Sequence, residues 1–454
     1  FGSSAAGRQT PGASSGCVCS ALPMSPRDGA RADPDRACVP RGAPKARARQ
    51  AAKRRTFPLI NSHIIAAADT GDLEVFLSTI EAHLPQMNLV NLSTALHRLA
   101  KMMAATPEAQ ASLRVRSALP ALTAAVRAAL LRAEQGRAPP QCQALSNVVW
   151  SLAVVGFADA LPLLRLASER ACEHFEHFKT FELASILWAF ATLGGWDASV
   201  WECSMPLLQK AAAHVAGHPD QFTFRCLVMI VWALATVGDA LGPDPSLLRC
   251  LATRIQPSLP TATCQELTQV AWSLSAAGVR DEAIFAEIAH RAVQRVLELK
   301  KQELADLLWG CANAGYFHRG LFEGAAIAAQ SVDLELPQVI AVLWSFSHLR
   351  PRHHATRVAM LSLLPRCTPR LGELRQEDLS AVLLGAAKCF GRVGAPSASE
   401  ANVPPVPQQA VEFFDVVAEW MRARLGQLGD LPLVHAAVSF LAVQGEPLRG
   451  TAGQ

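Results

Sequence analysis

A twelve-residue motif recurs along most of this chain, and it restricts the fold more than any other feature. In the clearest copies a leucine is followed five residues later by tryptophan and eleven residues later by glycine. These copies start at Leu145, Leu183, Leu227, Leu267 and Leu304. A sixth copy starts at Val339, and degenerate copies start at Leu92, Leu379 and Leu433. Successive tryptophan positions lie 35 to 54 residues apart, which is the spacing of helix-pair repeats.

The spacing of apolar residues inside the motif predicts a helix. They fall at positions 0, 3, 4, 5, 7, 8 and 10, counted from the first leucine. This period is helical and the apolar face is wide, so we expect inner helices that are covered on most sides. The closing glycine predicts a left-handed helix end, and Pro351 ends the copy that lacks it. Thr263 and Glu266 predict a capping box.

Between the motifs lie more amphipathic stretches, such as 281–299 and 412–425, which predict a second helix in each repeat. Alanine and leucine dominate, and the chain has a single tyrosine, a composition that favours helices over sheets. The predicted fold is therefore all-α, a solenoid of about eight to nine helix-pair repeats.

The chain divides into four predicted segments. Residues 1–56 are basic and have no hydrophobic period, which predicts a disordered segment that is either transit-peptide-like or a linker. Residues 57–390 form the helical repeat array. Residues 391–408 form a proline-rich inserted loop, and residues 409–454 a terminal repeat that we expect to be truncated.

No pattern of residues indicates chemistry. The chain has no phosphate-binding glycine loop followed by lysine, no HExxH and no GxSxG. Its 12 cysteines include no CxxC pair, so we predict no metal site and no cofactor. His353 and His354 follow Pro351 and are interpreted as a helix start. The longest apolar run, 226–237, is too short to cross a membrane. We predict a protein that is not an enzyme.

Motif positions 2, 6 and 9 lie at i, i+4 and i+7 and so share one stripe of the helix. Position 6 is serine, alanine or glycine in seven copies, and its neighbours vary among asparagine, threonine, glutamine, aspartate, methionine and histidine. A surface that reads one RNA base per repeat would need this pattern. Tight packing between helices explains the small residue equally well, and the geometry alone favours that alternative. The repeated tryptophan, flanked by apolar residues, is interpreted as core rather than as a base-stacking group.

The candidate RNA-facing residues combine this stripe with cations that could meet phosphates. They are Arg98, Lys101, Asn147, Ser151, Ser185, Thr192, Thr236, Gln269, Ser273, Asp306, Asn313, Ser345, His348 and Lys388. Arg392 is a further cation beside the last of them. Residues 56–454 have a net charge of −4, so any basic track must be local.

The strings LSNVVWSLAVVG, ELASILWAFATLGG, ELTQVAWSLSAAG and ELADLLWGCANAG resemble the repeats of octotricopeptide-repeat proteins. They are also similar to those of the Leu-rich FAST-kinase family and the RNA-editing substrate-binding complex. The resemblance covers roughly residues 57–445. It implies a non-catalytic solenoid that binds single-stranded RNA, together with other ribonucleoprotein subunits, in a mitochondrion or alternatively a chloroplast. Its implied role is transcript stability, processing, editing or translation. The alternative is a HEAT- or armadillo-like scaffold that binds proteins.

Overall fold

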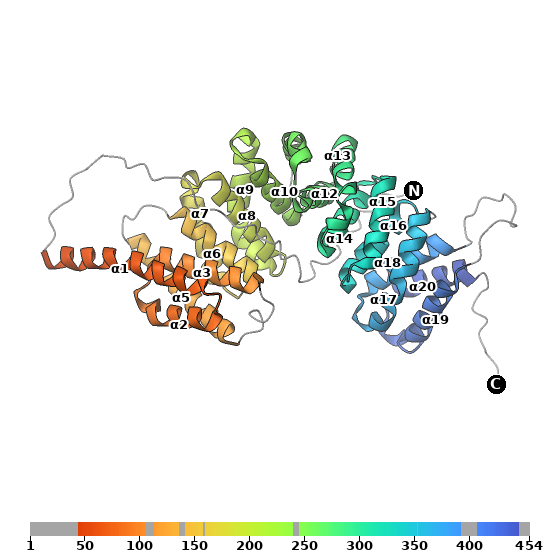
Figure 1. Ribbon diagram of the computed structural model, residues 1–454, viewed down its shortest axis with the longest axis horizontal. Coiled ribbons are helices and arrows are strands. Elements are labelled where there is room, and N and C mark those ends of the chain that lie inside the picture. Colours follow the sequence, from red (N-terminus) through yellow and green to blue (C-terminus); the bar gives the residue numbers. More distant parts are fainter. Residues whose placement is uncertain are drawn as a thin grey trace. The chain divides into compact units, whose positions relative to one another are not determined.

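The computed structural model of the chain describes residues 44–105, 113–135, 141–157, 159–238, 245–351, 353–391 and 406–444. Within these ranges every regular element is a helix (Figure 1). The predicted all-α repeat fold is confirmed. The chain forms two compact units, an N-terminal unit, Gly16–Leu241, and a C-terminal unit that begins at Gly242.

The N-terminal unit carries four copies of the motif, each inside one inner helix. The inner helices are α3 (Leu89–Ala105), α6 (Cys142–Val155), α8 (Thr180–Gly194) and α10 (Phe224–Val237). The remaining helices are α1 (Pro44–Asp69), α2 (Leu73–His83), α5 (Leu113–Gln135), α7 (Leu161–Glu173) and α9 (Ala198–Gly217). Each inner helix packs on the next one, and α5, α7 and α9 pack on one another as a second, outer layer.

The C-terminal unit repeats this arrangement with five copies. The inner helices are α12 (Cys264–Ala276), α14 (Lys301–Ala314), α16 (Leu336–Leu349), α18 (Gln376–Phe390) and α20 (Asp430–Gln444). The outer helices are α11 (Pro245–Ile255), α13 (Glu282–Val293), α15 (Arg319–Ser331), α17 (His354–Cys367) and α19 (Gln408–Arg422). Consecutive inner helices pack together, as do α13, α15, α17 and α19. With nine motif-bearing inner helices, the predicted eight to nine repeats are confirmed.

Short 3-10 helices connect several of these elements. They are η1 (Leu84–Gln86), η2 (Phe175–His177), η3 (Pro219–Gln221), η5 (Gln256–Thr261), η6 (Val296–Glu298), η7 (Thr368–Glu373) and η9 (Leu425–Gln427). None of the described helices is long and apolar enough to cross a membrane.

The apolar motif positions form the core, as their period predicts. In α14, Leu304, Leu307, Leu308 and Cys311 have no exposed surface. These residues cover more than one side of the helix because α12, α16 and α15 all pack against α14. An inner helix is thus enclosed on most sides, which is why its apolar face is wide in the sequence.

Most of the predicted helix ends are confirmed. Gly156 and Gly315 adopt the left-handed conformation, Gly278 has a positive φ, and α16 ends at Leu349, before Pro351. Gly238 has a φ of 58° but a ψ of −135°, which lies outside the left-handed helical region. Gly194 differs, because it continues α8 as a helical residue. A Cβ there would overlap the indole of Trp201, so close packing rather than a left-handed turn requires this glycine.

The capping box predicted at the start of α12 is present. The Thr263 Oγ1 accepts the backbone N–H of Glu266 at 3.2 Å, and the Glu266 carboxylate accepts the backbone N–H of Thr263 at 2.9 Å. Both orphan donors are satisfied reciprocally, which fixes where the helix begins.

The boundary of the N-terminal segment needs a correction. Helix α1 begins at Pro44, so residues 44–56 are helical and not disordered as predicted. The basic run contains alanine, arginine, lysine and glutamine, which are strong helix formers, and composition alone hides this. Residues 1–43 and 392–405 lie outside the described residues. Helix α18 ends at Phe390 and α19 begins at Gln408, on either side of the predicted loop.

Candidate nucleic-acid interface

Motif position 6 lies in the seam between consecutive inner helices. Ser151, Ser273 and Ser345 have 0% exposed surface, and each hydroxyl donates to the carbonyl four residues earlier in its own helix. At Gly310 of α14 a Cβ would lie 2.8 Å from the backbone carbonyl carbon of Ala271 in α12. The prediction that these three serines face RNA is therefore wrong. Close approach of the neighbouring backbone explains the small residue, which is the packing alternative.

The accessible face of the inner helices instead combines positions 2, 5 and 9, which lie at i, i+3 and i+7. In α12 these residues are Gln269, Trp272 and Ala276, and all three are half-buried. The same holds for positions 2, 5 and 9 of α6 and α10. We call this stripe the inner face. The middle residue of the accessible stripe is therefore the tryptophan at position 5, and not the small residue at position 6 as predicted.

Tryptophan rings on the inner face follow one another from one helix to the next as tilted pairs. In the N-terminal unit the centroids of Trp188 and Trp232 lie 6.0 Å apart. In the C-terminal unit the indole of Trp309 lies 6.0 Å from that of Trp272 and 6.1 Å from that of Trp344, with interplanar angles of 32° and 30°. A fixed motif position on parallel, equally spaced helices produces this row of rings, which we call the indole row.

The indole row is core only in part. Trp188 and Trp309 are buried, at 4% and 8% exposure. The other four motif tryptophans keep accessible surface and are half-buried; they are Trp150, Trp232, Trp272 and Trp344. The prediction that tryptophan belongs to the core is correct for the two buried rings. For the other four, one part of the ring packs and another part remains open to solvent.

The polar candidates at position 9 lie on the inner face but make bonds within the protein. The hydroxyls of Thr192 and Thr236 donate to the carbonyls of Trp188 and Trp232, at 2.9 and 2.8 Å. The Asn313 amide donates to the Ser275 carbonyl of α12 at 2.9 Å. All three are half-buried. Only the Asn313 bond joins two inner helices; the two threonine bonds stay within their own helices.

Position 2 supplies half-buried polar groups, Asn147, Ser185, Gln269 and Asp306. Asp306 belongs to a chain of hydrogen bonds that joins two inner helices. The Gln338 amide of α16 donates to the Gln302 oxygen at 3.0 Å, and the Gln302 amide donates to the Asp306 carboxylate at 2.8 Å. Burial raises the pKa of Asp306 to about 7, although the bond from Gln302 lowers it.

Cations gather at two places at or beside the inner face, one in each unit. In the N-terminal unit Arg98 and Lys101 follow His97 in α3, and the His97 ring lies 5.1 Å from that of Trp150. Arg98 pairs with Asp69 at 3.0 Å. Burial, followed by the charges of Lys101 and Arg98, lowers the pKa of His97 to about 4. His97 is therefore neutral at physiological pH and continues the inner face as an aromatic ring.

The second group of cations lies in the C-terminal unit. Burial lowers the pKa of His348, and the charges of Lys388 and Arg280 lower it further. His348 and Lys388 are exposed and occupy position 9 of α16 and α18. Arg392 lies outside the described residues. Between the two groups, position 9 of the described inner helices is uncharged, so the cations form two patches rather than one continuous track.

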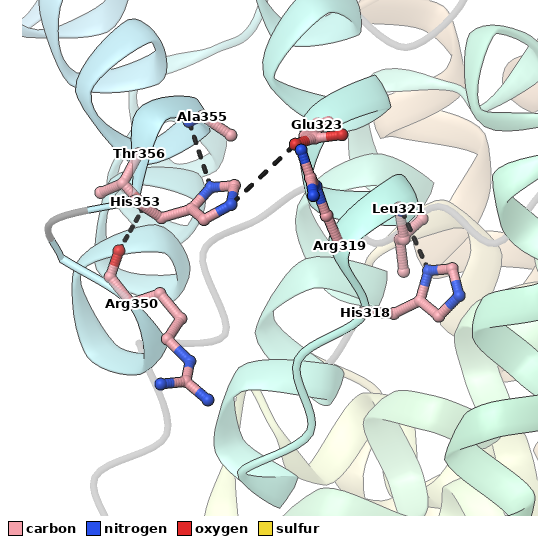
Figure 2. Close-up of polar contacts among 8 residues, drawn as sticks. All are labelled: His318, Arg319, Leu321, Glu323, Arg350, His353, Ala355 and Thr356. Atoms are coloured by element: carbon pink, nitrogen blue, oxygen red, sulfur yellow. Dashed lines mark hydrogen bonds and ion pairs between the residues drawn. The ribbon is translucent and has the colours of Figure 1, made fainter.

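The His353-His354 pair begins a helix, as predicted. His353 is the N-cap of α17, and its Nδ1 accepts the backbone N–H of Ala355 at 3.2 Å (Figure 2). Its Nε2 lies 3.9 Å from Glu323, which pairs with Arg319. His318 caps α15 in the same way. Both imidazoles thus satisfy backbone donors at helix starts and are not directed at a cavity. No cluster of three metal-ligating side chains occurs among the described residues.

The sequence did not indicate a hollow that lies where the indole row ends. An open hollow of about 490 Å³ is lined mainly by α16, α18 and α20. Trp344 and His348, whose rings stack at 4.6 Å, form part of its wall. The signal that could have found it is position 5 of α18, where Leu384 replaces tryptophan. A smaller side chain at a position that carries an indole in the six preceding inner helices leaves room beside the last ring.

Comparison with known proteins bears on this arrangement. No curated protein matches the chain. Residues 88–356, more than half of the 454 residues, match the family described as RNA-editing substrate-binding complex 6 protein. The match runs from α3 to the start of α17, so it includes seven of the nine inner helices and the indole row. The resemblance to the RNA-editing substrate-binding complex is thereby confirmed, and this chain belongs to the family of RNA-editing substrate-binding complex 6 proteins.

Proposed function

We propose that the inner face of the repeats binds single-stranded RNA, and that the protein is a non-catalytic subunit of a mitochondrial RNA-editing complex. Membership of the family supports the setting, because its name denotes a complex that binds the substrate of RNA editing. Transcript processing, stability or translation, and the chloroplast as the alternative compartment, belong to the same proposal.

The observation that carries the proposal is the row of partly open indoles on one face. Bases of a single strand stack on aromatic side chains whatever their sequence, because each base has a π-face. The half-buried indoles are held in place by packing within the repeats. They can therefore present an aromatic surface to a base without a change of conformation. The exposed Lys388 lies beside the row, where a phosphate backbone would need a cation.

Polar groups at positions 2 and 9 complete the proposed interface. Gln269 and Asn147 are half-buried on the same stripe as the indoles, so their amides can donate to or accept from base edges. The two separate cation patches predict few phosphate contacts. We therefore infer that stacking, more than charge, supplies the affinity.

The first prediction concerns the affinity of the purified protein for a fluorescent single-stranded RNA. With about four phosphate contacts, the affinity should fall roughly 50-fold between 50 and 200 mM salt.

Trp272→Leu should weaken binding about tenfold, because one base loses its stacking partner. Leucine already occupies the same motif position in α18, so the fold should tolerate it. Fluorescence anisotropy measures both effects.

The matched control is Trp420→Leu, which changes a half-buried tryptophan of the outer helix α19. Its RNA affinity should equal that of the wild type. Absent binding, or binding that ignores salt and Trp272→Leu alike, would overturn the proposal. Capture of a protein subunit in the absence of RNA would then favour the scaffold alternative.

A further inference from the structure

The hollow between α16, α18 and α20 has the features of a built site. Its volume of about 490 Å³ falls within the range of about 300–1,000 Å³ that small-molecule sites occupy. Its wall combines a ring surface, from Trp344 and His348, with polar groups from α18 and α20. The cationic Lys388 and the carboxylate of Glu377 also line it.

The hollow lies where the regular row of rings is interrupted. Indoles at position 5 of α12, α14 and α16 follow one another at 6.0 and 6.1 Å. The next member of this row would stand at position 5 of α18, but that residue is Leu384, which lines the hollow. A ligand ring placed there would take the position of the next member of the row, beside Trp344.

Ser380, which lines the same space, carries a buried hydroxyl without a partner among the described residues. It occupies motif position 1 of α18 and is 6% exposed. In α6 and α12 the hydroxyl at this position donates to the next inner helix. Ser146 donates to the Glu182 carbonyl at 2.9 Å, and Thr268 donates to the Glu303 carbonyl at 3.4 Å.

A hydrogen-bonded bridge joins the start of α18 to the segment before α20. The Gln376 amide donates to the Gln427 carbonyl at 3.2 Å, and its oxygen accepts the Gly429 N–H at 3.1 Å. Ser380 of α18 and His435 of α20 both line the hollow, and their buried Oγ and Nδ1 atoms have no partner among the described residues. Buried polar atoms are nearly always satisfied, so two orphans from facing helices indicate a polar ligand.

From these observations we propose that the hollow binds one unpaired nucleobase with its phosphate, stacked on the ring pair Trp344–His348. Ser380 and His435 form hydrogen bonds to the base edge, and Lys388 contacts the phosphate. The inference rests on the proposed RNA binding and deepens it, because it assigns one base-specific slot to a face that otherwise stacks bases without regard to sequence.

Two variants test the slot. Leu384→Trp restores the motif residue and fills the space with the protein's own indole. Ser380→Ala removes the orphan hydroxyl and should leave thermal stability unchanged or slightly raised, since no hydrogen bond is lost. The matched control is Ser146→Ala at the same motif position. The Ser146 hydroxyl already donates a hydrogen bond to the Glu182 carbonyl. This control variant should lower stability and leave nucleotide binding unchanged.

Two ligands separate free nucleotide from RNA as the source of the base. Saturation-transfer NMR with adenosine 5′-monophosphate should show binding to the wild type and Ser146→Ala, no binding to Leu384→Trp and about tenfold weaker binding to Ser380→Ala. A single-stranded RNA decamer should bind both hollow variants about tenfold more weakly than the wild type.

The outcomes distinguish the two proposals. If the decamer binds the wild type with a steep salt dependence while both variants match it for both ligands, the slot is refuted and the RNA-binding inner face stands. If the mononucleotide binds as described but no RNA does, the slot stands as a nucleotide site and the proposed function fails. Should Leu384→Trp prove unfolded by its melting curve, Ser380→Ala alone decides.

Discussion

Replacing Asp306 with asparagine is expected to stabilise the protein at pH 8. Burial raises the pKa of this carboxyl group from 3.8 to about 7, so the folded state binds the proton more tightly than the unfolded state does. The free energy of unfolding therefore falls as pH rises from about 4 to about 7, and above pH 7 the full penalty of the buried charge remains. Asparagine carries no charge and still accepts the hydrogen bond from Gln302.

The size of this effect follows from the shift. At 1.36 kcal/mol per pKa unit it amounts to about 4 kcal/mol at most. Asp306 keeps some accessible surface, although its carboxyl group is closely surrounded by protein atoms, and solvent screening reduces the expected gain to about 2 kcal/mol. Urea unfolding at pH 8 and pH 4.5 measures the gain, which should be largest at pH 8 and small at pH 4.5.

The control for this prediction is Asp333→Asn, an exposed aspartate of the same unit. It should change the unfolding free energy little, and by the same amount at both pH values. If Asp306→Asn destabilises the protein at pH 8, the Gln338–Gln302–Asp306 chain requires the carboxylate in its charged form, and burial does not penalise that charge. The result matters for function because Asp306 lies on the inner face, where a charged carboxylate would repel RNA phosphates.

The second large effect is expected at Gly310. A methyl group there would lie 2.8 and 2.9 Å from the backbone carbon and oxygen of Ala271 and 2.9 Å from the backbone nitrogen of Trp272. Backbone atoms cannot move aside as a flexible side chain can, so α14 must shift away from α12. Gly310→Ala should therefore cost about 2–3 kcal/mol of stability, despite the better helix propensity of alanine.

Urea unfolding checks the cost, and Gly372→Ala is its control, because no atom lies within 4 Å of a Cβ there. That variant should change stability by no more than about 0.5 kcal/mol. An unchanged or raised midpoint for Gly310→Ala would show that the inner helices are not in such close contact. The same shift of α14 should disturb the spacing of Trp272 and Trp309, so RNA affinity should fall along with stability.

These two residues illustrate how the repeats couple fold to function. Position 6 sets how closely consecutive inner helices approach, and position 5 carries the indole on the neighbouring face. Close approach brings successive rings to about 6 Å from each other, which orders them into a row. The small residue thus acts on the proposed RNA surface through the helix spacing and never touches that surface itself.

The repeat fold could be derived almost entirely from the sequence. A motif that recurs with helical period and ends in glycine or proline specifies inner helices, their ends and their number, because these depend on interactions within one helix or with its copy next in the chain. The capping box at Thr263 and the helix start at His353 are predictable for the same reason. Two local predictions were wrong. Composition alone did not show that residues 44–56 are helical, and motif position alone did not show that Gly194 is required by packing against Trp201.

The candidate site could be predicted from the sequence only in part. Periodicity shows that positions 2 and 9 share a face, but it cannot show which side of the stripe a neighbouring helix covers, so it places Ser151, Ser273 and Ser345 on a surface they do not reach. Which positions stay open depends on the angle and distance at which separate helices pack. Tertiary packing alone brings the indoles into a row and leaves the hollow beside Leu384, because both arise from residues more than thirty positions apart in the chain.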